Sequence, residues 1–574
     1  MIWRFAGWVL ALLLCGFTAA HVWKSYPQHY FRPPVHGAMY LSGTFGELRP
    51  NHFHTGIDVK PAGGKTGQAI LAAAEGYIER IKVEAAGYGK VLYIRHPNGY
   101  TTVYAHLQNF TPEVEEYVKK VQYTRQQFYV NLHPKKQEFP VKKGQEIGKL
   151  GNSGSSSGPH LHFEIRQSAT GLPLNPLLFG LDFKDPLPPQ LHQLKVYALN
   201  DKLETTDSRV YAIEKKDRAF SIKGDTVVLG AWRAGFALRT YDHMPGGAKQ
   251  NGIYKLELLK NDSLRYDFEF EKLEFGESRY ANAHMDYQER ILKKGNFHRC
   301  FTLPGNRLSF YKKNEEGGVV ALFKDKATKI TLHVKDVSGN VSSLTFWIKR
   351  GEISALPSPV FNYKLPWNQE NIISNEDVEL TFPKGTFYED CYLRFQKTND
   401  NSANYLSPVH RIHDYKTPVH LYYKIALTPS APLPENLKTK AFIAFCNRNS
   451  KIQNCGGFWK GEKLIAEVRS LGDYSIMLDT VAPLILPKLF SKNMQQSEKM
   501  TFKITDNFPP SGKAKDLRYR ATVDEKWILM EYDAKNDLLI HRFDGRISTG
   551  EHKLRLEVTD DRGNKAVFED TFTR

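Results

Sequence analysis

Five residues near the N-terminus have the types and spacing of a metal-dependent hydrolytic site. They are His54 and Asp58 in the run NHFHTGID, His106 in VYAHL, and His160 and His162 in GPHLHFE. Catalytic zinc takes three protein ligands from His, Asp, Glu or Cys and keeps a fourth position for water. The bound water then ionises near neutral pH and becomes a nucleophile. The five side chains therefore supply three ligands of the right type and two spare imidazoles.

The last motif predicts a β-strand. Residues 160–165 alternate polar and apolar side chains, a pattern of period two. His160 and His162 then point to one face, so one can bind the metal while the other stands beside it. Glu164 falls on the same face, where we expect it to orient a ligand imidazole.

The first motif predicts a loop that leads into a strand. Gly56 lies between His54 and Asp58 and favours a turn over a helix, so we expect the strand at 57–59. The helical H-E-x-x-H zinc motif is absent from the chain.

The order of these motifs resembles the lysostaphin/LytM-type zinc endopeptidases, metallopeptidase family twenty-three. The matching run is H-x-x-x-D, then Y-x-H-L, then H-x-H-F-E, with similar connecting segments such as AILAAAEGYIERI and VKKGQEIGKLGNSGSSSG. The similarity covers roughly residues 37–178, and every ligand position is filled. It implies an antiparallel β-sheet peptidase domain of the duplicated-hybrid-motif type.

The resemblance also implies a role for each of the five residues. His54, Asp58 and His162 become the ligands of one zinc ion per chain. His160 and His106 become the catalytic pair, with base-like and oxyanion-stabilising roles that the sequence does not divide between them. An imidazole beside the developing negative charge suits either role.

Several neighbours compete for a place in this site. His52 and Asn51 stand near enough in sequence to reach an open metal position, but we expect both to shape the loop. His96, in the turn IRHPNGY, is predicted to be structural. Tyr104 lies two residues before His106 on a probable strand and is therefore predicted to line the cleft.

The start of the chain predicts export. The run MIWRFAGWVLALLLCGFTAA has one Arg, an apolar stretch and a small-residue end, which is typical of a signal peptide cleaved after Ala20. Leu14 before Cys15 disfavours a lipoprotein. No later stretch approaches the ~20 apolar residues of a membrane span.

Charge and cysteines narrow the setting. The net charge is +17, or +16 without Arg4. For an exported protein, this positive charge favours an anionic envelope polymer as the binding partner. The chain has no recognised nucleic-acid-binding motif. Among the remaining cysteines, Cys446 and Cys455 are separated by a polar loop and could pair across a hairpin.

The chain of 574 residues predicts a mostly β protein of several domains. We expect a signal peptide over 1–20, a zinc metallopeptidase domain over 21–180, a β-sandwich over 186–350, a β-rich domain of uncertain fold over 360–478 and a β-sandwich over 481–574. The two sandwiches share the motif V-x-D-x-x-G-N, at 334–340 and 558–564, and resemble immunoglobulin-like modules.

One insertion departs from the compact family pattern. Residues 112–128, PEVEEYVKKVQYTRQQF, have helical spacing and good helix formers. Because the segment follows the His106 strand directly, we expect it to form a wall of the cleft.

Taken together, the residues predict an exported zinc endopeptidase, and the family resemblance implies that it cleaves peptide cross-links of bacterial peptidoglycan. The resemblance leaves the bond open between a D-alanyl–diaminopimelyl and a glycyl bond. Two alternatives stay open: a silent LytM-like scaffold that regulates a cell-wall amidase, and a secreted protease of Gly-rich proteins. The expected partners are peptidoglycan stem peptides and a regulatory envelope protein, in the periplasm, the cell envelope or the medium.

Overall fold

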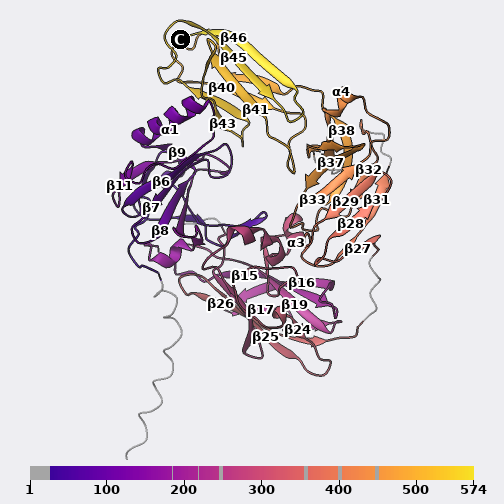
Figure 1. Cartoon of the computed structure of the whole chain (residues 1–574). Helices are drawn as coiled ribbons and strands as arrows, with labels where there is room; N and C mark the ends of the chain where they lie inside the picture. The colour runs from indigo at the N-terminus through magenta and orange to yellow at the C-terminus, as the bar shows by residue number, and fades with distance from the viewer. Residues whose placement is uncertain are drawn as a thin grey trace, which may run out of the picture.

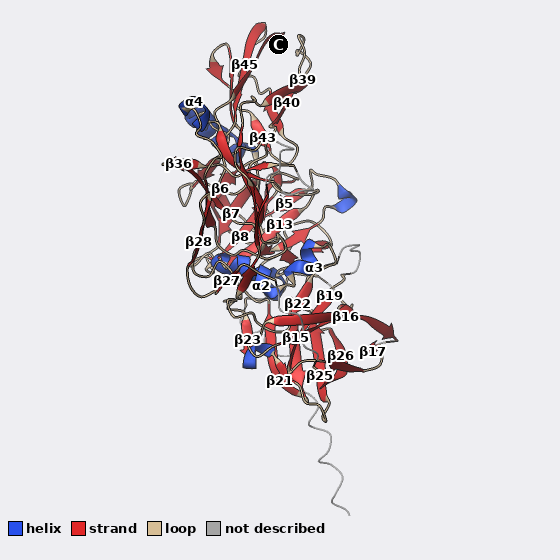
Figure 2. Ribbon diagram, turned by 90° about the vertical axis from the view of Figure 1, so that its right-hand side faces the viewer, coloured by secondary structure: helices blue, strands red, loops and turns tan. Residues whose placement is uncertain are grey.

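The computed structural model describes residues 26–183, 185–217, 219–244, 250–353, 360–398, 404–446 and 451–574. The signal peptide predicted over 1–20 lies outside the described residues. Four groups of strands follow one another around a ring (Figure 1). Strands dominate and the helices are short (Figure 2). None of the helices in the described ranges has the length and apolar character that crossing a bilayer requires.

The first group of strands carries all five predicted site residues. Its main sheet is antiparallel, with nine strands in the order β1-β4-β13-β8-β7-β6-β10, and with β11 on β6 and β14 on β13. The strands are β1 (Leu41–Gly43), β4 (Ile57–Val59), β6 (Gly76–Val83), β7 (Lys90–Arg95), β8 (Tyr100–Ala105), β10 (Val130–Leu132), β11 (Pro140–Val141), β13 (Leu161–Gln167) and β14 (Pro173–Leu174).

Two smaller sheets complete this group. One consists of β5 (Ala69–Leu71), β12 (Glu146–Leu150) and β9 (Leu107–Phe110), and the other of β2 (Leu48–Arg49) and β3 (His52–Phe53). Two 3-10 turns lie at Ala62–Gly64 and Pro176–Phe179.

Strand β13 confirms the alternation predicted from the sequence. Leu161, Phe163 and Ile165 are fully buried in the core, while His162 and Glu164 lie on the opposite face. The strand pairs with β4 on one side and β8 on the other, and His162 stands directly opposite Asp58. The sheet register therefore brings the first and last motifs of the site together.

The insertion forms helix α1 (Pro112–Arg125), as its spacing predicts. Val114 and Val118 bury one face, and the helix ends where Gln126 adopts a left-handed conformation, with φ of 48°. The predicted cleft wall is wrong, because the described residues that line the site cleft include none from α1. The helix instead faces the C-terminal end of the chain.

The second group, the first β domain, has twelve strands that hydrogen-bond into one continuous sheet, and the sandwich predicted for this segment stays a prediction. Long strand β16 pairs with β15 over its first half and with β17 over its second, so the sheet continues from one set of strands into the next. Its strands are β15 (Gln190–Leu199), β16 (Thr205–Lys216), β17 (Ala219–Ile222), β18 (Thr226–Leu229), β19 (Arg233–Tyr241), β20 (Lys255–Lys260), β21 (Ser263–Glu269), β22 (Phe297–Arg299), β23 (Tyr311–Asn314), β24 (Val320–Ala321), β25 (Thr328–Lys335) and β26 (Val341–Arg350). Short helical turns lie at Phe275–Tyr280, α2 (Ala281–His284), α3 (Tyr287–Ile291) and Glu315–Gly318.

The first β domain and the N-terminal group share one hydrophobic core. Phe53, next to His54, packs against Phe270 at 5.6 Å and Phe310 at 5.4 Å between ring centroids. Phe270 lies so close to Gly46 that an added Cβ would stand 2.3 Å from its ring. The loop before the first motif is therefore held from outside the peptidase sheet.

The third group, the middle β domain, has its own core and consists of two five-stranded sheets and a two-stranded one. Its strands are β27 (Tyr363–Leu365), β28 (Asn371–Ser374), β29 (Val378–Phe382), β30 (Cys391–Leu393), β31 (Phe395–Thr398), β32 (Val409–Ile412), β33 (Tyr423–Leu427), β34 (Ala441–Phe445), β35 (Gln453–Asn454), β36 (Phe458–Lys460), β37 (Lys463–Val468) and β38 (Gly472–Leu478), with helix α4 (Glu435–Lys438). Cys446 and Cys455 are both buried here, and their suggested pairing stays a prediction.

The last group, the C-terminal β domain, has two four-stranded sheets around a core of its own. They consist of β39 (Leu484–Leu489), β40 (Lys499–Thr505), β41 (Arg518–Val523), β42 (Lys526–Trp527), β43 (Glu531–Asp533), β44 (Leu538–Arg542), β45 (Glu551–Thr559) and β46 (Lys565–Thr573). We propose that these four groups are the four domains that follow the signal peptide in the sequence analysis.

The C-terminal β domain returns to helix α1 and closes the ring (Figure 1). The Lys119 ammonium lies 3.0 Å from the Asp544 carboxylate, and Tyr123 meets Trp527 edge to face with ring centroids 5.2 Å apart. Lys535 donates a hydrogen bond of 3.3 Å to the carbonyl of Ser156, in the glycine-rich loop before His160.

Candidate metal centre and its cleft

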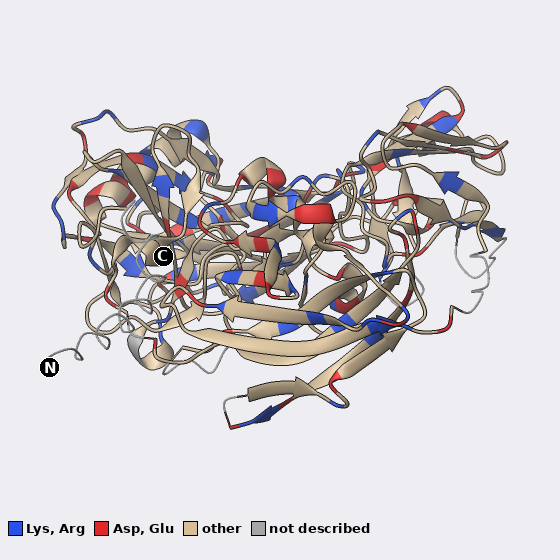
Figure 3. Cartoon of the chain, turned by 90° about the horizontal axis from the view of Figure 1, so that it is seen from below, with Lys and Arg blue, Asp and Glu red and all other residues tan. Residues whose placement is uncertain are grey.

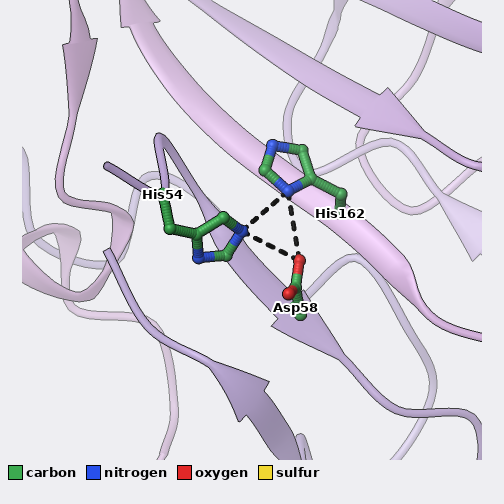
Figure 4. A group of neighbouring side chains, drawn as sticks. All are labelled: His54, Asp58 and His162. Atoms are coloured by element: carbon green, nitrogen blue, oxygen red, sulfur yellow. Dashed lines mark hydrogen bonds and ion pairs between the residues drawn. The ribbon is translucent and has the colours of Figure 1, made fainter. Parts of the chain in front are cut away.

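Three of the predicted residues converge on one point (Figure 4). His54 Nε2 lies 3.0 Å from Asp58 Oδ1 and 2.9 Å from His162 Nδ1, and His162 Nδ1 lies 3.1 Å from Asp58 Oδ1. Ligand atoms that each stand about 2 Å from one zinc ion are a little over 3 Å apart. The spacing and the donor types therefore fit a metal ion, and these three residues could hold one.

The outer nitrogen of each ligand imidazole is anchored on the protein. His54 Nδ1 donates to the carbonyl of Thr44 at 2.8 Å, and His162 Nε2 donates to Glu164 Oε1 at 2.8 Å. Because carbonyl and carboxylate oxygens only accept, each outer nitrogen carries its proton, and the nitrogen that faces the triad is the one that can offer a lone pair to a metal ion. This is the arrangement that fixes the tautomer of metal-binding histidines, and it confirms the predicted place of Glu164 beside a ligand.

Asp58 connects the triad to a cation that the sequence reasoning missed. Its second oxygen accepts a hydrogen bond of 2.9 Å from Arg49, a residue of β2 that no motif distinguishes. Burial acts to raise the pKa of Asp58, but His54 and the hydrogen bond from His162 hold it well below its usual range. The carboxylate is thus charged and ready to bind a cation.

Glu164 is the centre of a second, deeper network. It is fully buried, and besides His162 it accepts from Arg166 and from Tyr88. Burial acts to raise its pKa, but Arg166 and His162 hold the pKa below its usual range. For His162, burial acts to lower the pKa, but Asp58 and Glu164 raise it to about 9. Tyr88 and Arg166 were not predicted as part of the site.

The two remaining histidines stand beside the triad with the same tautomer. His106 Nδ1 donates to the carbonyl of Ser153 at 2.9 Å, and His160 Nδ1 donates to that of Gly158 at 2.8 Å. Their rings lie 4.7 Å apart, and His160 Nε2 is 3.5 Å from Asp58 Oδ1. Burial lowers the pKa of both, that of His106 to about 3, so both imidazoles are neutral with a free Nε2 lone pair.

The predicted place of Tyr104 in the cleft is wrong. The residue is fully buried, and its hydroxyl accepts from the backbone N–H of Ala73 at 2.8 Å. Strand β8 ends at Ala105, and His106 has a φ of 61°, so the alternation of faces stops before His106. Two residues of spacing therefore do not place Tyr104 and His106 on one face.

The other neighbouring residues have structural contacts. His96 is buried between the carbonyl of Glu75 and the hydroxyl of Thr102, each 2.7 Å from a ring nitrogen. Asn51 accepts from Asn282 of the first β domain at 3.0 Å, and His52 contacts the carbonyl of Pro50 at 2.8 Å. Neither His52 nor Asn51 joins the triad.

An open cleft of about 780 Å³ lies over the triad. One wall comes from the first β domain, through His243 and Gln250, which sequence reasoning did not connect to the site. The full lining is Ser42, Glu47, Arg49, Asp58, Lys60, Pro61, Gly64, Ser157, Gly158, Pro159, His160, His243 and Gln250.

Sequence comparison places this domain among known peptidases. The model of peptidase family M23 matches residues 52–124 and 120–176, and a second model, of a Zu5-like domain, matches residues 362–479. The second match covers the segment whose fold we did not name from the sequence.

Two curated relatives show the range of this similarity. The DD-carboxypeptidase/endopeptidase Mpg of Neisseria meningitidis serogroup B is 35% identical over 128 residues, which are 22% of this chain and 23% of the relative. The murein hydrolase activator NlpD of Escherichia coli (strain K12) is 33% identical over 155 residues, 27% of this chain and 32% of the relative. The chain thus matches about a quarter to a third of their length.

Solved structures match over a similar share of the chain. The catalytic domain of the M23 protein EnpA from Enterococcus faecalis is 25% identical and covers 25% of this chain and 95% of that one, at a TM-score of 0.19. A zinc-containing peptidase from Vibrio cholerae is 24% identical over 27% of this chain and 41% of that one, at a TM-score of 0.20.

The β architecture and the sequence matches define the class: a mostly β protein with a peptidase domain at its N-terminus. Through residues 52–176 the chain matches peptidase family M23, and this portion resembles the lysostaphin/LytM type. The predicted fold class and family are thereby confirmed.

Proposed function

We propose that the protein is an exported zinc endopeptidase that hydrolyses peptide cross-links of peptidoglycan. The observation that carries the proposal is the His54–Asp58–His162 triad, whose imidazoles both have their outer nitrogen anchored. When bound, zinc supplies a Lewis acid and a water molecule whose pKa is lowered toward ~7. The triad contributes two imidazole nitrogens and one carboxylate oxygen to hold it.

We assign the proton chemistry to His106 and His160. Each has its Nδ1 proton tied to a backbone carbonyl and a free Nε2, so each can accept a proton in the cleft. Hydrolysis of a peptide bond consumes one water, and a proton taken by an imidazole can be returned to the leaving amine. The second imidazole, once protonated, stabilises negative charge on the carbonyl oxygen.

Peptidoglycan is the substrate that the relatives favour. The Neisseria relative is named for carboxypeptidase and endopeptidase activity on D-amino-acid bonds, and the other is named as an activator of murein hydrolases. Export follows from the predicted signal peptide and agrees with a wall substrate. We propose that His243 and Gln250, on the wall of the cleft from the first β domain, contact the stem peptide.

A silent scaffold that regulates a cell-wall amidase is the second candidate, because one relative is an activator. All three ligand residues of the triad are present, and the neutral His106 and His160 stand beside it. Both observations favour the enzyme over the scaffold. An enzyme turns over cross-linked peptide with zinc bound, whereas a scaffold raises the activity of an added amidase without cleaving alone.

The experiment uses the full mature chain from His21, loaded with zinc and incubated with purified cross-linked peptidoglycan. We expect mass spectrometry to show loss of cross-linked dimers and to identify the bond. His162→Ala should abolish both zinc binding and cleavage, and His160→Ala should retain zinc but lose most of the cleavage. His133→Ala, in an exposed loop, is the control.

Cleavage by His162→Ala at the rate of the unmodified chain would overturn the proposed site. One zinc per chain without cleavage of wall or of an oligoglycine peptide would reject the enzyme. The amidase-activation assay would then decide for the scaffold.

A further inference from the structure

Two β domains carry a buried acidic cluster, and neither cluster is explained by the peptidase site. In each cluster, three carboxylate oxygens lie within 4.8 Å of one another. The first acidic cluster is Asp185, Asp242 and Asp336, and the second acidic cluster is Asp479, Asp506 and Asp560.

The two clusters are built from the same parts of their domains. One aspartate lies in the segment that enters the domain, at 185 or 479. The next follows the end of strand β19 or β40, at 242 or 506. The third opens the turn of the V-x-D-x-x-G-N motif, at 336 or 560. The repeated motif thus marks a repeated cluster.

The turn of the first acidic cluster ties two of its members together. The side-chain amide of Asn340 donates to Asp336 Oδ2 at 2.7 Å and to the backbone carbonyl of Asp185 at 2.9 Å. The backbone N–H of Asn340 donates to Asp336 Oδ1 at 2.9 Å. These bonds fix the carboxylates but leave other oxygens facing the cluster.

The second acidic cluster repeats this geometry. The side-chain amide of Asn564 donates to Asp560 Oδ2 at 2.7 Å and to the carbonyl of Asp479 at 2.9 Å. Its backbone N–H donates to Asp560 Oδ1 at 2.8 Å. The same construction therefore arises twice in one chain.

Both clusters contain buried carboxylate oxygens without a partner. Asp242 is 2% exposed, and its Oδ1 accepts no hydrogen bond. Asp479 is 0% exposed, and its Oδ2 accepts no hydrogen bond either. Asp185 Oδ2 is likewise unpaired. Within the described ranges, none of the six aspartates has a Lys, Arg or His nitrogen within 4.0 Å, although buried charge normally has a partner. Each cluster thus presents buried negative charge that a bound cation would neutralise.

The surroundings have room for a small ion but supply no ammonium to the carboxylates. A cavity beside the first acidic cluster leaves about 10 Å³ for the centre of a water-sized sphere, which suits a single small occupant. Beside the second acidic cluster, Lys440 donates to Asn564 Oδ1 at 2.6 Å and to the carbonyl of Arg562 at 3.1 Å.

We propose that each acidic cluster binds one calcium ion, so that the chain holds two in addition to the metal of the peptidase site. Calcium prefers six to eight oxygen ligands from carboxylates and carbonyls and accepts irregular geometry. Zinc prefers nitrogen and sulfur, and magnesium keeps several waters around it, for which a closed cavity has little space.

Each proposed ion lies where one domain meets the preceding one. Thr44 lines the cavity of the first acidic cluster, and its hydroxyl exchanges hydrogen bonds with the backbone of Gly252. The backbone carbonyl of Thr44 accepts the hydrogen bond from His54 Nδ1. Asp479 joins the middle β domain to the C-terminal one. Calcium would thus stiffen two domain junctions, one of which supports the loop of the peptidase site.

The test uses the full mature chain, stripped with a chelator and reloaded with one equivalent of zinc so that the peptidase site is filled. We expect equilibrium dialysis to give two calcium ions per chain at millimolar calcium. Asp242→Asn and Asp506→Asn should each lower the number to one, and the double variant to none. Asp262→Asn, an exposed aspartate of the first β domain, should keep two.

Thermal unfolding gives a second readout that separates a ligand site from a structural cluster. Calcium should raise the midpoint of the unmodified chain, and equal magnesium should raise it less. In chelator, Asp242→Asn should unfold no earlier than the unmodified chain, because it removes a repelling carboxylate. In calcium it should unfold earlier.

The proposal is overturned if the unmodified chain binds no calcium at 10 mM, which is about tenfold above the dissociation constants of the weakest extracellular sites. It is also overturned if the variants keep both ions, or if magnesium acts as strongly as calcium. Should Asp242→Asn fail to fold, Asp185→Asn tests the same cluster, and the stoichiometry of the unmodified chain still decides.

Discussion

Asp58 is the residue on which the candidate metal centre depends most. Its Oδ1 stands within 3.1 Å of a nitrogen of both ligand histidines, and its Oδ2 accepts from Arg49. A carboxylate that is charged, buried and oriented by a guanidinium does not need to reorganise when a cation arrives. His54 and His162 are preorganised in the same way, because a hydrogen bond fixes the outer nitrogen of each ring.

At this scale we predict the effect of Glu164→Gln. The substitution keeps the size of the side chain but removes the charge that orients His162 and pairs with Arg166. Loss of such an outer partner lowers metal affinity by about 10–100-fold. Competition with a chromogenic chelator measures the zinc dissociation constant. Glu79→Gln, on β6 of the same sheet, should leave it unchanged, and an unchanged constant in Glu164→Gln would mean that Glu164 serves only Arg166.

The site residues could be named from the sequence because their motifs are short and local. H-x-x-x-D and H-x-H each hold their donors within a few residues, so spacing alone limits how they lie. Arg49, Tyr88 and His243 could not be named in this way. They reach the site through pairing of β2, through a turn before β7 and from another domain, and none of these follows from local spacing.

Among the elements, the junction of β4 and β13 is the one that builds the triad. Gly56 lies where these strands meet, and a Cβ on it would stand 2.4 Å from the carbonyl oxygen of Phe163 and 3.0 Å from His162 Cε1. The glycine between the two ligands of the first motif is therefore needed for close packing as well as for the turn.

We accordingly predict that Gly56→Ala pushes β4 away from β13 and separates the ligands. Zinc affinity should fall by at least tenfold, and the thermal midpoint should also fall, because the added methyl overlaps backbone that cannot turn aside. Gly276→Ala, where nothing lies within 4 Å of the new Cβ, is the matched control. Equal zinc affinity in Gly56→Ala and the unmodified chain would contradict this account.

Two buried histidines, one on strand β22 and one on helix α2, should make the stability of the protein depend on pH. His298 and His284 are buried with their rings in contact, at 3.0 Å between nitrogens, and burial lowers the pKa of His298 to about 3. The folded pKa lies below the unfolded value of about 6.5, so stability is full above pH 6.5 and is lost as the pH falls toward 3. Each such histidine lowers the free energy of unfolding by up to about 1.4 kcal/mol for every pH unit in this range.

His298→Gln should therefore show a shallower loss of stability between pH 7 and pH 5 than the unmodified chain. Urea midpoints at the two pH values give the comparison, with the exposed His133→Gln as control. A variant whose midpoint falls as steeply as that of the unmodified chain would show that His298 is protonated in the folded state.

The elements could be predicted where periodicity was strong. Strand β13, the strand at 57–59 and helix α1 all follow from their patterns. The partner of α1 could not be predicted, because Lys119 and Tyr123 meet residues more than 400 positions away. The predicted position of Tyr104 was wrong because His106 has a left-handed backbone conformation. The alternation of side chains between the two faces of β8 therefore ends before His106, although the sequence pattern gives no sign of it.

For the whole molecule, charge is distributed rather than gathered. Seen from below, the positions of Lys and Arg and those of Asp and Glu are interspersed along the ribbon (Figure 3). The net charge of +17 therefore represents a small excess spread over the surface. The charges that matter for architecture are the few that close the ring, at α1 and the C-terminal β domain.

We predict that Lys119→Glu opens the ring. The substitution places a carboxylate beside Asp544 and turns an attraction at 3.0 Å into repulsion. Small-angle X-ray scattering should show a larger radius of gyration, which Asp544→Lys in the same chain should restore. Lys120→Glu, an exposed neighbour on α1, is the control. A radius that does not change in Lys119→Glu would mean that Tyr123 and Trp527 hold the domains without the ion pair.

The shared core also bears on any attempt to isolate the peptidase. Cutting the chain near residue 185 would expose Phe53 and Phe45, which pack in one cluster with Phe270, and would remove Gly252 from Thr44. We expect the fragment to be less stable than the full chain and to bind zinc more weakly, as chelator competition on both would show.

The returning C-terminal β domain makes the ring an intramolecular complex. A domain tethered to its own partner acts at an effective concentration that can reach the millimolar range, so even a weak surface is occupied much of the time. Charged contacts of this kind weaken as the Debye length shortens with added salt. The molecule would then behave as a latch whose open fraction follows the ionic strength around it, without any ligand and without a change in the fold of a single domain.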